Sequence, residues 1–246
     1  MRNGILVIGY ELLLGKRQDK HLPRLIEILG VRGLRLDWAR FVGDDPPLLE
    51  TTLRESFASG DVVFSFGGIG ATPDDVTRQC AAAAAGVLLV RHAEAVALIE
   101  ARFGESAYPN RVLMADLPQG ARLIPNPVNQ IPGFSLRQHH FLPGFPNMAW
   151  PMAEWVLDTH YRHLFRVQPE SERTVMVYDV AESTLIPTMR ELLAAFPGIK
   201  LASLPSTTNS GEIELGVRGE GADVMPAYDW LIARLDALGL RHQPLA

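Results

Sequence analysis

Cysteine is almost absent from this sequence. The single cysteine among 246 residues, Cys80, excludes an intramolecular disulfide and any zinc site built from several thiolates. One unpaired thiol is typical of a protein from a reducing compartment. Because Cys80 lies in an alanine-rich stretch, we expect it to be a small packing residue rather than a nucleophile.

Long hydrophobic runs and an excess of basic charge are also missing. No apolar run approaches the roughly 18 residues that span a bilayer, and the N-terminal MRNGILVIGYELLLG has no signal-peptide cleavage site. The formal net charge is -5, from 23 basic and 28 acidic residues, which argues against nucleic acid as the main partner. We therefore expect a cytoplasmic protein that binds neither membranes nor nucleic acid.

What the chain does have is a regular alternation of apolar, β-favouring runs with helical patterns. This alternation predicts parallel strands joined by crossover helices, which is an α/β fold. Hydrophobic residues make up 47% of the chain, enough to bury a core. The apolar runs lie at 4–9, 34–42, 61–66 and 139–143, helical patterns lie at 16–30, after the turn at 43–47, at 76–104 and up to 165, and 105–135 is expected to be irregular.

The pattern changes after residue 170. From residue 171 the sequence predicts a strand, a helix, two strands and a final helix, which together make a small α+β domain. We therefore predict two domains, 1–166 and 167–246, joined near residues 166–170.

Three early strands are each followed by a short polar or glycine-containing loop. These loops are GYE at 9–11, GDD at 43–45 and GGIGATPDD at 67–75. In open parallel sheets ligands bind outside the carboxyl ends of the strands. We therefore expect the three loops to converge on one site.

The third loop has the features of a helix start. Thr72 can act as the N-cap, and Pro73 then occupies the first helical position, where its missing N–H costs nothing. Asp74 and Asp75 fall in the first turn, where the positive end of the helix dipole favours carboxylates. A purely structural interpretation of these side chains is therefore open.

Capping leaves three glycines of this loop, Gly67, Gly68 and Gly70, without an explanation. Glycines at a strand-to-helix turn present backbone N–H groups to an anion, most often a phosphate. A phosphate beside Asp74 and Asp75 would be repelled unless a divalent cation (Mg²⁺, Mn²⁺ or Co²⁺) bridges them. The loop has neither the GK[ST] of a Walker A motif nor the G-x-G-x-x-G of a dinucleotide fingerprint. It therefore favours a phosphorylated ligand bound through a metal.

The stretch GGIGATPDDVTR resembles the GGxGxTPxDxT signature of the MoaB/Mog-type molybdopterin-binding domain family. Four further segments resemble those of the CinA branch of this family, in the same order, and together the matches cover most of residues 4–160. The final β-α-β-β-α unit resembles the KH-like domain that follows this module. The four segments are GYELLLG at 9–15, FVGDDPPLL at 41–49, IPNPVNQIPGF at 124–134 and LPGFPNMAWPMAE at 142–154.

The resemblance implies a three-layer α/β/α fold with a mostly parallel sheet that binds a pterin phosphate or a nucleotide diphosphate at these loops. Relatives of this fold commonly form dimers or trimers, so we expect a homo-oligomer. By motif match the ligand-binding residues are Glu11, Gly67, Gly68, Gly70, Thr72, Thr77 and Asn126, the metal ligands are Asp44, Asp45, Asp74 and Asp75, and the catalytic residues are Asp45 and Asp75.

Two functions are left open by the resemblance. The CinA branch implies metal-dependent hydrolysis of ADP-ribose to AMP and ribose 5-phosphate. The Mog branch works on molybdopterin, including its adenylylation, and the alternative function is therefore a non-catalytic molybdopterin binding or transfer protein of molybdenum cofactor metabolism. RNA binding by 167–246 is disfavoured because SGEIELGVRGEGAD is more acidic than basic. The chain ends at residue 246, so we expect no nicotinamide mononucleotide deamidase activity.

Several residues depart from the family pattern. Tyr10 replaces a small or acidic residue beside the first loop, Gln79 stands where glutamate is frequent, and Asn129 replaces a glycine. The adjacent His139 and His140 lie in an expected strand, so they point to opposite faces and cannot share a metal. We expect both histidines to be structural.

Overall fold

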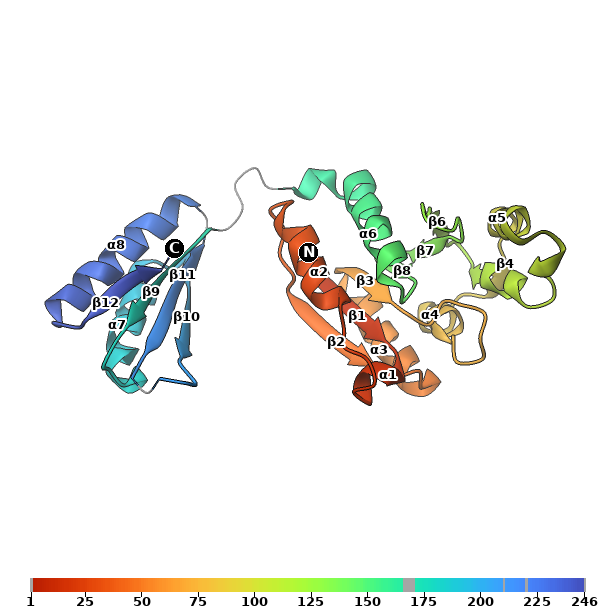
Figure 1. The fold of residues 1–246 in the computed structure, drawn as a ribbon. Coiled ribbons are helices and arrows are strands. Elements are labelled where there is room, and N and C mark those ends of the chain that lie inside the picture. The colour runs from red at the N-terminus through yellow and green to blue at the C-terminus, as the bar shows by residue number, and fades with distance from the viewer. Residues whose placement is uncertain (1, 166–170, 210, 220, 246) are drawn as a thin grey trace. The chain divides into compact units, whose positions relative to one another are not determined.

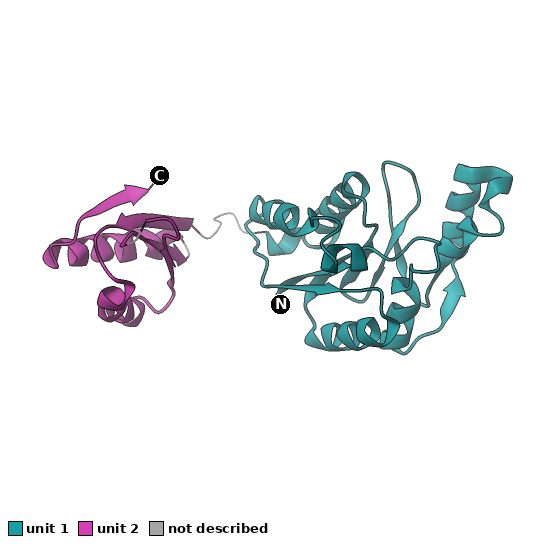
Figure 2. Cartoon of the chain, turned by 60° about the horizontal axis from the view of Figure 1, so that its bottom comes forward, with its two compact units in different colours: residues 1–165 teal, residues 166–246 magenta. Residues whose placement is uncertain are grey.

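The computed structural model describes residues 2–165, 171–209, 211–219 and 221–245. The chain divides into two compact units, residues 1–165 (unit 1) and residues 166–246 (unit 2), which are coloured separately in Figure 2. The predicted domain boundary between residues 166 and 167 lies outside the described residues. Each unit has a hydrophobic core of its own.

Unit 1 is built on a six-stranded sheet with the order β2-β1-β3-β8-β7-β6. Its neighbours β2, β1, β3 and β8 are parallel, and β7 is antiparallel to both β8 and β6. The predicted α/β fold with a mostly parallel sheet is therefore confirmed. The strands are β1 (Asn3–Ile8), β2 (Trp38–Val42), β3 (Val62–Phe66), β6 (Arg122–Ile124), β7 (Gly133–Leu136) and β8 (His139–Leu142).

Helices cover both faces of this sheet (Figure 1). In β1, Ile5 and Val7 pack with the residues of α2 and α6, whereas Leu6 and Ile8 pack with those of α3 and α4. This two-residue alternation with both sets buried is the pattern of a strand between two helical layers. The helices are α2 (His21–Gly30), α3 (Pro46–Ser59), α4 (Thr77–Ala85) and α6 (Pro146–His160).

Two segments differ from the sequence-based expectation. The helix predicted at 16–30 begins only at His21 as α2, and it is preceded by a loop and by a separate short helix, α1 (Tyr10–Leu13). The helical stretch expected at 76–104 is interrupted by β4 (Leu89–Arg91). This strand pairs antiparallel with β5 (Asp116–Pro118), and α5 (Ala93–Phe103) and two 3-10 helices lie between the two strands in the chain. Strands of three residues are too short for periodicity to reveal them.

Unit 2 follows the predicted order of strand, helix, two strands and helix, and adds a last strand, β12. The sheet order is β10-β11-β9-β12, and every neighbouring pair is antiparallel. The KH-like character of this unit stays a prediction. None of the helices in the described ranges has the length and apolar character to cross a membrane. The elements are β9 (Ser171–Val177), α7 (Glu182–Ala195), β10 (Lys200–Pro205), β11 (Ile213–Gly219), α8 (Gly221–Ala237) and β12 (His242–Leu245).

Candidate functional site

The loops that follow β1, β2, β3 and β8 meet at the carboxyl edge of the sheet. The Gly9 N–H donates to the Val42 carbonyl (3.0 Å), which joins the first loop to the second strand. The Tyr10 N–H donates to the Asp44 carboxylate (3.0 Å). The structure therefore brings the predicted loops together, with the loop after β8 as a fourth member because the Gly67 N–H donates to the Leu142 carbonyl (3.0 Å).

Close packing within the chain accounts for the three glycines of the third loop. Gly67 has a φ of 106°, and a Cβ there would lie under 3.0 Å from the Ile8 carbonyl oxygen. A Cβ on Gly68 would overlap the Thr77 side chain, whose hydroxyl donates to the Gly67 carbonyl (3.1 Å). A Cβ on Gly70 would overlap the Asp75 carboxylate. A ligand is therefore not required to explain why glycine stands at these positions.

The predicted helix start at Thr72 is wrong. Helix α4 begins at Thr77 with Val76 as its N-cap residue, so Pro73 does not occupy a first helical position. Residues 72–75 instead form a separate turn, in which the Thr72 N–H (2.9 Å) and hydroxyl (2.5 Å) donate to the Asp75 carboxylate. The helix starts late because the Thr77 N–H donates to the Gly68 carbonyl (3.0 Å), back across the loop.

Arg78, the second residue of α4, holds the loop at 67–75 in place through hydrogen bonds. No sequence pattern pointed to this residue. Its side chain is 3% exposed, and its guanidinium donates to the carbonyls of Gly70 (2.7 Å), Asp116 (3.1 Å) and Leu113. Burial lowers the pKa of the Arg78 guanidinium from its usual value, an effect that the nearby Asp116 and Asp75 carboxylates oppose. The loop at 67–75, called the glycine loop below, is thereby tied to the segment that carries β5.

Replacing Arg78 with methionine is expected to lower the free energy of unfolding of unit 1 by about 3 kcal/mol, because three backbone carbonyls lose the charged donor that the buried Arg78 provides. Arg102→Met, at an exposed position of α5, is the control and should change it by less than about 0.5 kcal/mol. Urea denaturation of the full chain measures both. Equal effects of the two variants would contradict the anchoring role.

The predicted carboxylates occupy two kinds of position. Asp45 is the N-cap of α3 and accepts the Leu48 N–H (3.0 Å). Asp44 faces the loop after β1, where burial raises the pKa of its carboxyl, and the Glu11 and Asp74 carboxylates raise that pKa further. The structure therefore places three like charges near one another at the edge of the sheet, a surplus of negative charge that a cation would relieve.

The four aspartates predicted as metal ligands do not form a metal cage by themselves. Within the described ranges, no three His, Cys, Asp or Glu side chains are grouped closely enough to hold a metal ion. Asp45 and Asp75 are already engaged by backbone N–H groups. Asp44 and Asp74 fit a Mg²⁺-type ion only in the arrangement where one or two carboxylates share the ion with ligand phosphates and water.

The remaining predicted residues have structural roles in the loops. Asn126 is 5% exposed, and its side-chain oxygen accepts the N–H groups of Val128 (3.0 Å) and Asn129 (3.4 Å). Asn129, at the position where the family pattern has glycine, caps the next turn through Ile131. Tyr10 is 47% exposed and packs its ring on Gly43. Ligand contacts of Thr77, which is fully buried, and of Asn126 stay predictions.

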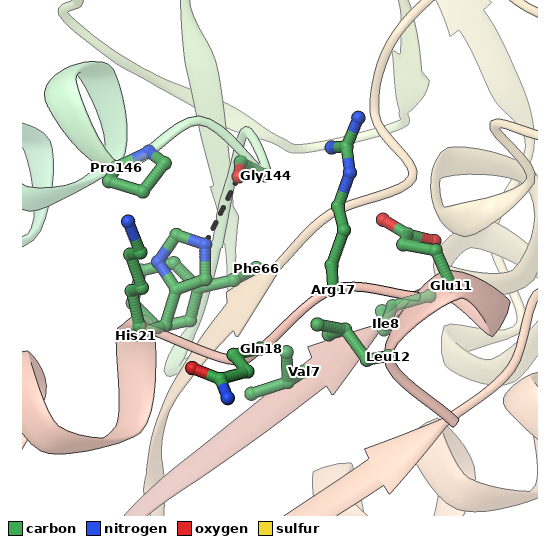
Figure 3. A pocket seen from close by; sticks show the side chains of 11 residues that line it. Val7, Ile8, Glu11, Leu12, Arg17, Gln18, His21, Phe66, Gly144 and Pro146 are labelled. Carbon is green, nitrogen blue, oxygen red and sulfur yellow. Dashed lines mark hydrogen bonds between the residues drawn. The ribbon is translucent and has the colours of Figure 1, made fainter. Parts of the chain in front are cut away.

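A cavity of about 410 Å³ opens beside Glu11, between the α1–α2 loop and the loop after β8 (Figure 3). The sequence pattern did not point to it, because its walls come from segments more than 100 residues apart. It is lined by Val7, Ile8, Glu11, Leu12, Arg17, Gln18, Lys20, His21, Phe66, Gly144 and Pro146.

His21 forms a fixed wall of this cavity. Its ring stacks on Phe66 at 4.4 Å between centroids, and its Nε2 lies 3.2 Å from the Gly144 carbonyl oxygen. A carbonyl only accepts, so Nε2 carries the hydrogen. Burial lowers the pKa of the imidazole, and Asp19 fixes the start of α2 by accepting the His21 and Leu22 N–H groups (2.9 Å each).

A second cavity, of about 610 Å³, opens at the turn at 72–75. Its lining includes Thr72, Arg78, Gln79 and Asp116. The Asp116 carboxylate there is bound to Arg91 at 2.5 and 3.1 Å. Residues 71–73 of the glycine loop line this second cavity, whereas the first cavity is lined by Glu11 of the loop after β1 and by no residue of the glycine loop.

Comparison with known proteins gives three findings. A profile of the family described as "Probable molybdopterin binding domain" matches residues 4–163. A CinA-like protein of Syntrophotalea carbinolica is 34% identical over 209 residues, which cover 80% of this chain and 50% of that protein. A CinA-like protein of Anaeromyxobacter dehalogenans is 32% identical over 274 residues, which cover 98% of this chain and 66% of that protein.

A solved structure is also similar. The crystal structure of a CinA protein of unknown function from Thermoplasma acidophilum aligns with a TM-score of 0.59 at 26% identity, and the alignment covers 64% of this chain and 98% of that one. The present chain spans 50% to 66% of the length of the two curated relatives.

Proposed function

The chain belongs to the molybdopterin-binding domain family and resembles its CinA-like members, and from this premise we propose that it binds a phosphorylated nucleotide or pterin at the glycine loop, residues 67–75. The ligand's phosphate lies against the backbone of this loop in the proposal. The rest of the ligand extends along the carboxyl edge of the sheet.

One observation carries this proposal. Four consecutive backbone N–H groups, those of residues 68–71, form no hydrogen bond to any other residue of the described chain, while the N–H groups before and after them are paired. They lie at the carboxyl end of β3, in the loop that leads to α4. Successive unpaired N–H groups in such a loop make an anion-binding concavity.

A divalent cation is part of the proposal. A phosphate at residues 68–71 would come close to Asp74 and Asp44, and the repulsion between these groups would oppose binding. Asp44 and Asp74 would hold Mg²⁺, Mn²⁺ or Co²⁺ jointly with the phosphate. Such an ion neutralises the phosphate and supplies a Lewis acid when bound.

The reaction that we propose for this site is the hydrolysis of ADP-ribose. One water adds across the pyrophosphate bond, so that AMP and ribose 5-phosphate form and a proton is released. Asp45 and Asp75 are the carboxylates proposed to act on the reacting groups. Each is held in one orientation by the N–H group that it accepts, from Leu48 and Thr72 respectively.

Binding without turnover is the second candidate function. The same two carboxylates already accept backbone N–H groups, Asp45 as the N-cap of α3 and Asp75 within the turn at 72–75, and Gln79 occupies the position where the family pattern often has glutamate. Both features support a molybdopterin binding or transfer protein as the alternative to a hydrolase. Release of AMP from ADP-ribose separates the two candidates.

Calorimetric titration with ADP-ribose and with a pterin phosphate, each with and without Mn²⁺, tests the proposal. Wild-type protein is expected to bind one of them only with the metal, and Asp44→Asn is expected to weaken that binding at least about tenfold, roughly 1.4 kcal/mol. Asparagine can still accept the Tyr10 N–H, so the loop is retained. Glu94→Gln, on exposed α5, should bind as wild type does. The absence of saturable binding in every arm would overturn the proposal.

A further inference from the structure

The cavity beside Glu11 combines an apolar floor with a polar rim. Its volume of about 410 Å³ falls within the roughly 300 to 1,000 Å³ of ordinary small-ligand sites. Figure 3 shows His21 on one side of this space and Arg17 with Glu11 on the other, and the apolar side chains lie between them. The floor consists of Val7, Ile8 and Leu12, whereas Phe66 is stacked on His21 and Pro146 lies on the same side as His21.

The rim carries two cations, Arg17 and Lys20, against one lining carboxylate, Glu11. Arg17 and Lys20 are exposed and make no ion pair with any described residue. Asp19, between them in sequence, is occupied by the two N–H groups at the start of α2. The chain has a net charge of -5 and only three lysines, of which Lys16 and Lys20 both lie in this loop. A local excess of positive charge on an acidic protein favours an anionic group of a ligand.

The back wall is rigid and uncharged. The stacked rings of His21 and Phe66 join α2 to β3, and the hydrogen bond from His21 to Gly144 joins both to the loop after β8. The positive charge is therefore confined to the rim, while the interior offers flat apolar and aromatic surface. Flat heterocycles suit such an interior, since they bury a large area with few rotatable bonds.

Resting on the function proposed above, we infer that this cavity holds the flat heterocycle of a phosphorylated nucleoside or pterin, and that Arg17 binds the phosphate nearest to that heterocycle. Glu11 lines the same space and accepts a ligand N–H or hydroxyl. The ligand then extends from the glycine loop across Glu11 into the cavity. Its ring gives specificity at one end and its phosphate gives affinity at the other.

A ligand that carries a flat ring is expected to bind this site more tightly than a simple sugar phosphate does. Ribose 5-phosphate can reach the glycine loop but leaves the apolar floor of the cavity exposed to water. ADP-ribose and a hydroxymethylpterin phosphate both carry a ring that covers the floor. Binding of the ring-bearing ligands is therefore expected to exceed that of ribose 5-phosphate by at least about tenfold.

Titration calorimetry of the full chain with Mn²⁺ present tests the inference, with ADP-ribose, hydroxymethylpterin phosphate and ribose 5-phosphate as probes. Arg17→Gln should weaken binding of the better ring-bearing probe about tenfold, and Arg17→Lys should recover part of the loss. Lys16→Gln is the matched control, because Lys16 is a neighbouring exposed cation that does not line the cavity. It should change the affinity by less than about twofold.

The outcomes distinguish this inference from the function on which it rests. If Arg17→Gln binds as wild type does while Asp44→Asn binds at least about tenfold more weakly, the cavity assignment is overturned and the glycine-loop site stands. Equal affinity for ribose 5-phosphate and the ring-bearing probes overturns it as well. If wild-type protein binds none of the probes, both proposals are overturned. The ring-bearing probe that binds more tightly identifies the heterocycle as a purine or a pterin.

Discussion

Alanine at position 67 is expected to lower the free energy of unfolding of unit 1 by about 4 kcal/mol, near the upper end of the effects of single substitutions. Two costs add at this position. Gly67 has a φ of 106°, which a residue with a Cβ adopts only under strain. The new Cβ would also overlap the carbonyl oxygen of Ile8, which belongs to the backbone of β1 and cannot turn away as a flexible side chain would.

Gly86→Ala is the matched control. Gly86 follows α4 with a φ of 70°, and a Cβ there would meet no atom within 4 Å. This variant therefore carries only the cost of the left-handed backbone, about 1 to 2 kcal/mol. The difference between the two variants isolates the close contact between the glycine loop and β1.

Tryptophan fluorescence during urea denaturation measures this difference if the signal comes from unit 1 alone. The chain has four tryptophans, and only Trp230 lies in unit 2. A Trp230→Phe background therefore leaves three reporters, Trp38, Trp150 and Trp155, all within unit 1. Equal destabilisation by Gly67→Ala and Gly86→Ala would show that the Ile8 contact has no energetic weight.

Acid is expected to destabilise unit 1 by about 5 kcal/mol between pH 6.5 and 4.5 through two buried histidines. Burial lowers the pKa of His139 and of His140 from 6.5 to about 3 in each case, and positively charged neighbours (Arg137 for His139, Arg122 for His140) lower them further. The folded chain then binds no proton at these sites, whereas the unfolded chain binds two. Each extra proton costs about 1.4 kcal/mol of stability per pH unit.

The direction of this effect follows from the direction of the shifts. Because the folded-state pKa values lie below the unfolded ones, their contribution is fully present above pH 6.5 and is lost as the pH falls toward 3. The two rings lie on opposite faces of β8. His139 bonds the Ser56 hydroxyl (2.5 Å) on the α3 side, and His140 bonds Ser135 and Tyr161 (2.8 Å each) toward α6.

The slope of unfolding free energy against pH, rather than its absolute value, tests this prediction. His139→Phe removes one titrating group and should reduce the slope between pH 6.5 and 4.5 by about one proton, even if the variant is less stable at pH 7.5. A slope that is the same in wild type and His139→Phe would contradict the assignment.

Three strands of unit 1 and the loops after the early strands were predictable because they depend on patterns that a sequence displays directly, whereas β5, β6 and the start of β7 lie in the stretch 105–135 that was expected to be irregular. The apolar runs at 4–9, 61–66 and 139–143 correspond to β1, β3 and β8 within one residue at each end. The convergence of GYE, GDD and GGIGATPDD follows from the rule that parallel strands present their carboxyl ends at one edge. The opposite facing of His139 and His140 follows likewise from the two-residue period of a strand.

The late start of α4 was not predictable from local preference. Thr72, Pro73 and Asp75 fit a helix start by residue type, but Thr77 bonds back to Gly68 and the turn at 72–75 closes on itself. The competing bonds involve backbone groups whose positions depend on the packing of β3 against β1. Short strands such as β4 were missed for a related reason, since three residues gain their stability from a partner strand.

The sequence by itself determined the α/β fold, the family signature and the acidic loops at one edge of the sheet, because these depend on periodicity and on residues close together in the chain. The tertiary structure decided the rest. Gly67 is required by the carbonyl of Ile8, Arg78 by three carbonyls of other segments, and the cavity wall by a hydrogen bond between His21 and Gly144, 123 positions apart. Contacts between such distant positions form only when both elements are packed on the sheet, and no local pattern encodes them.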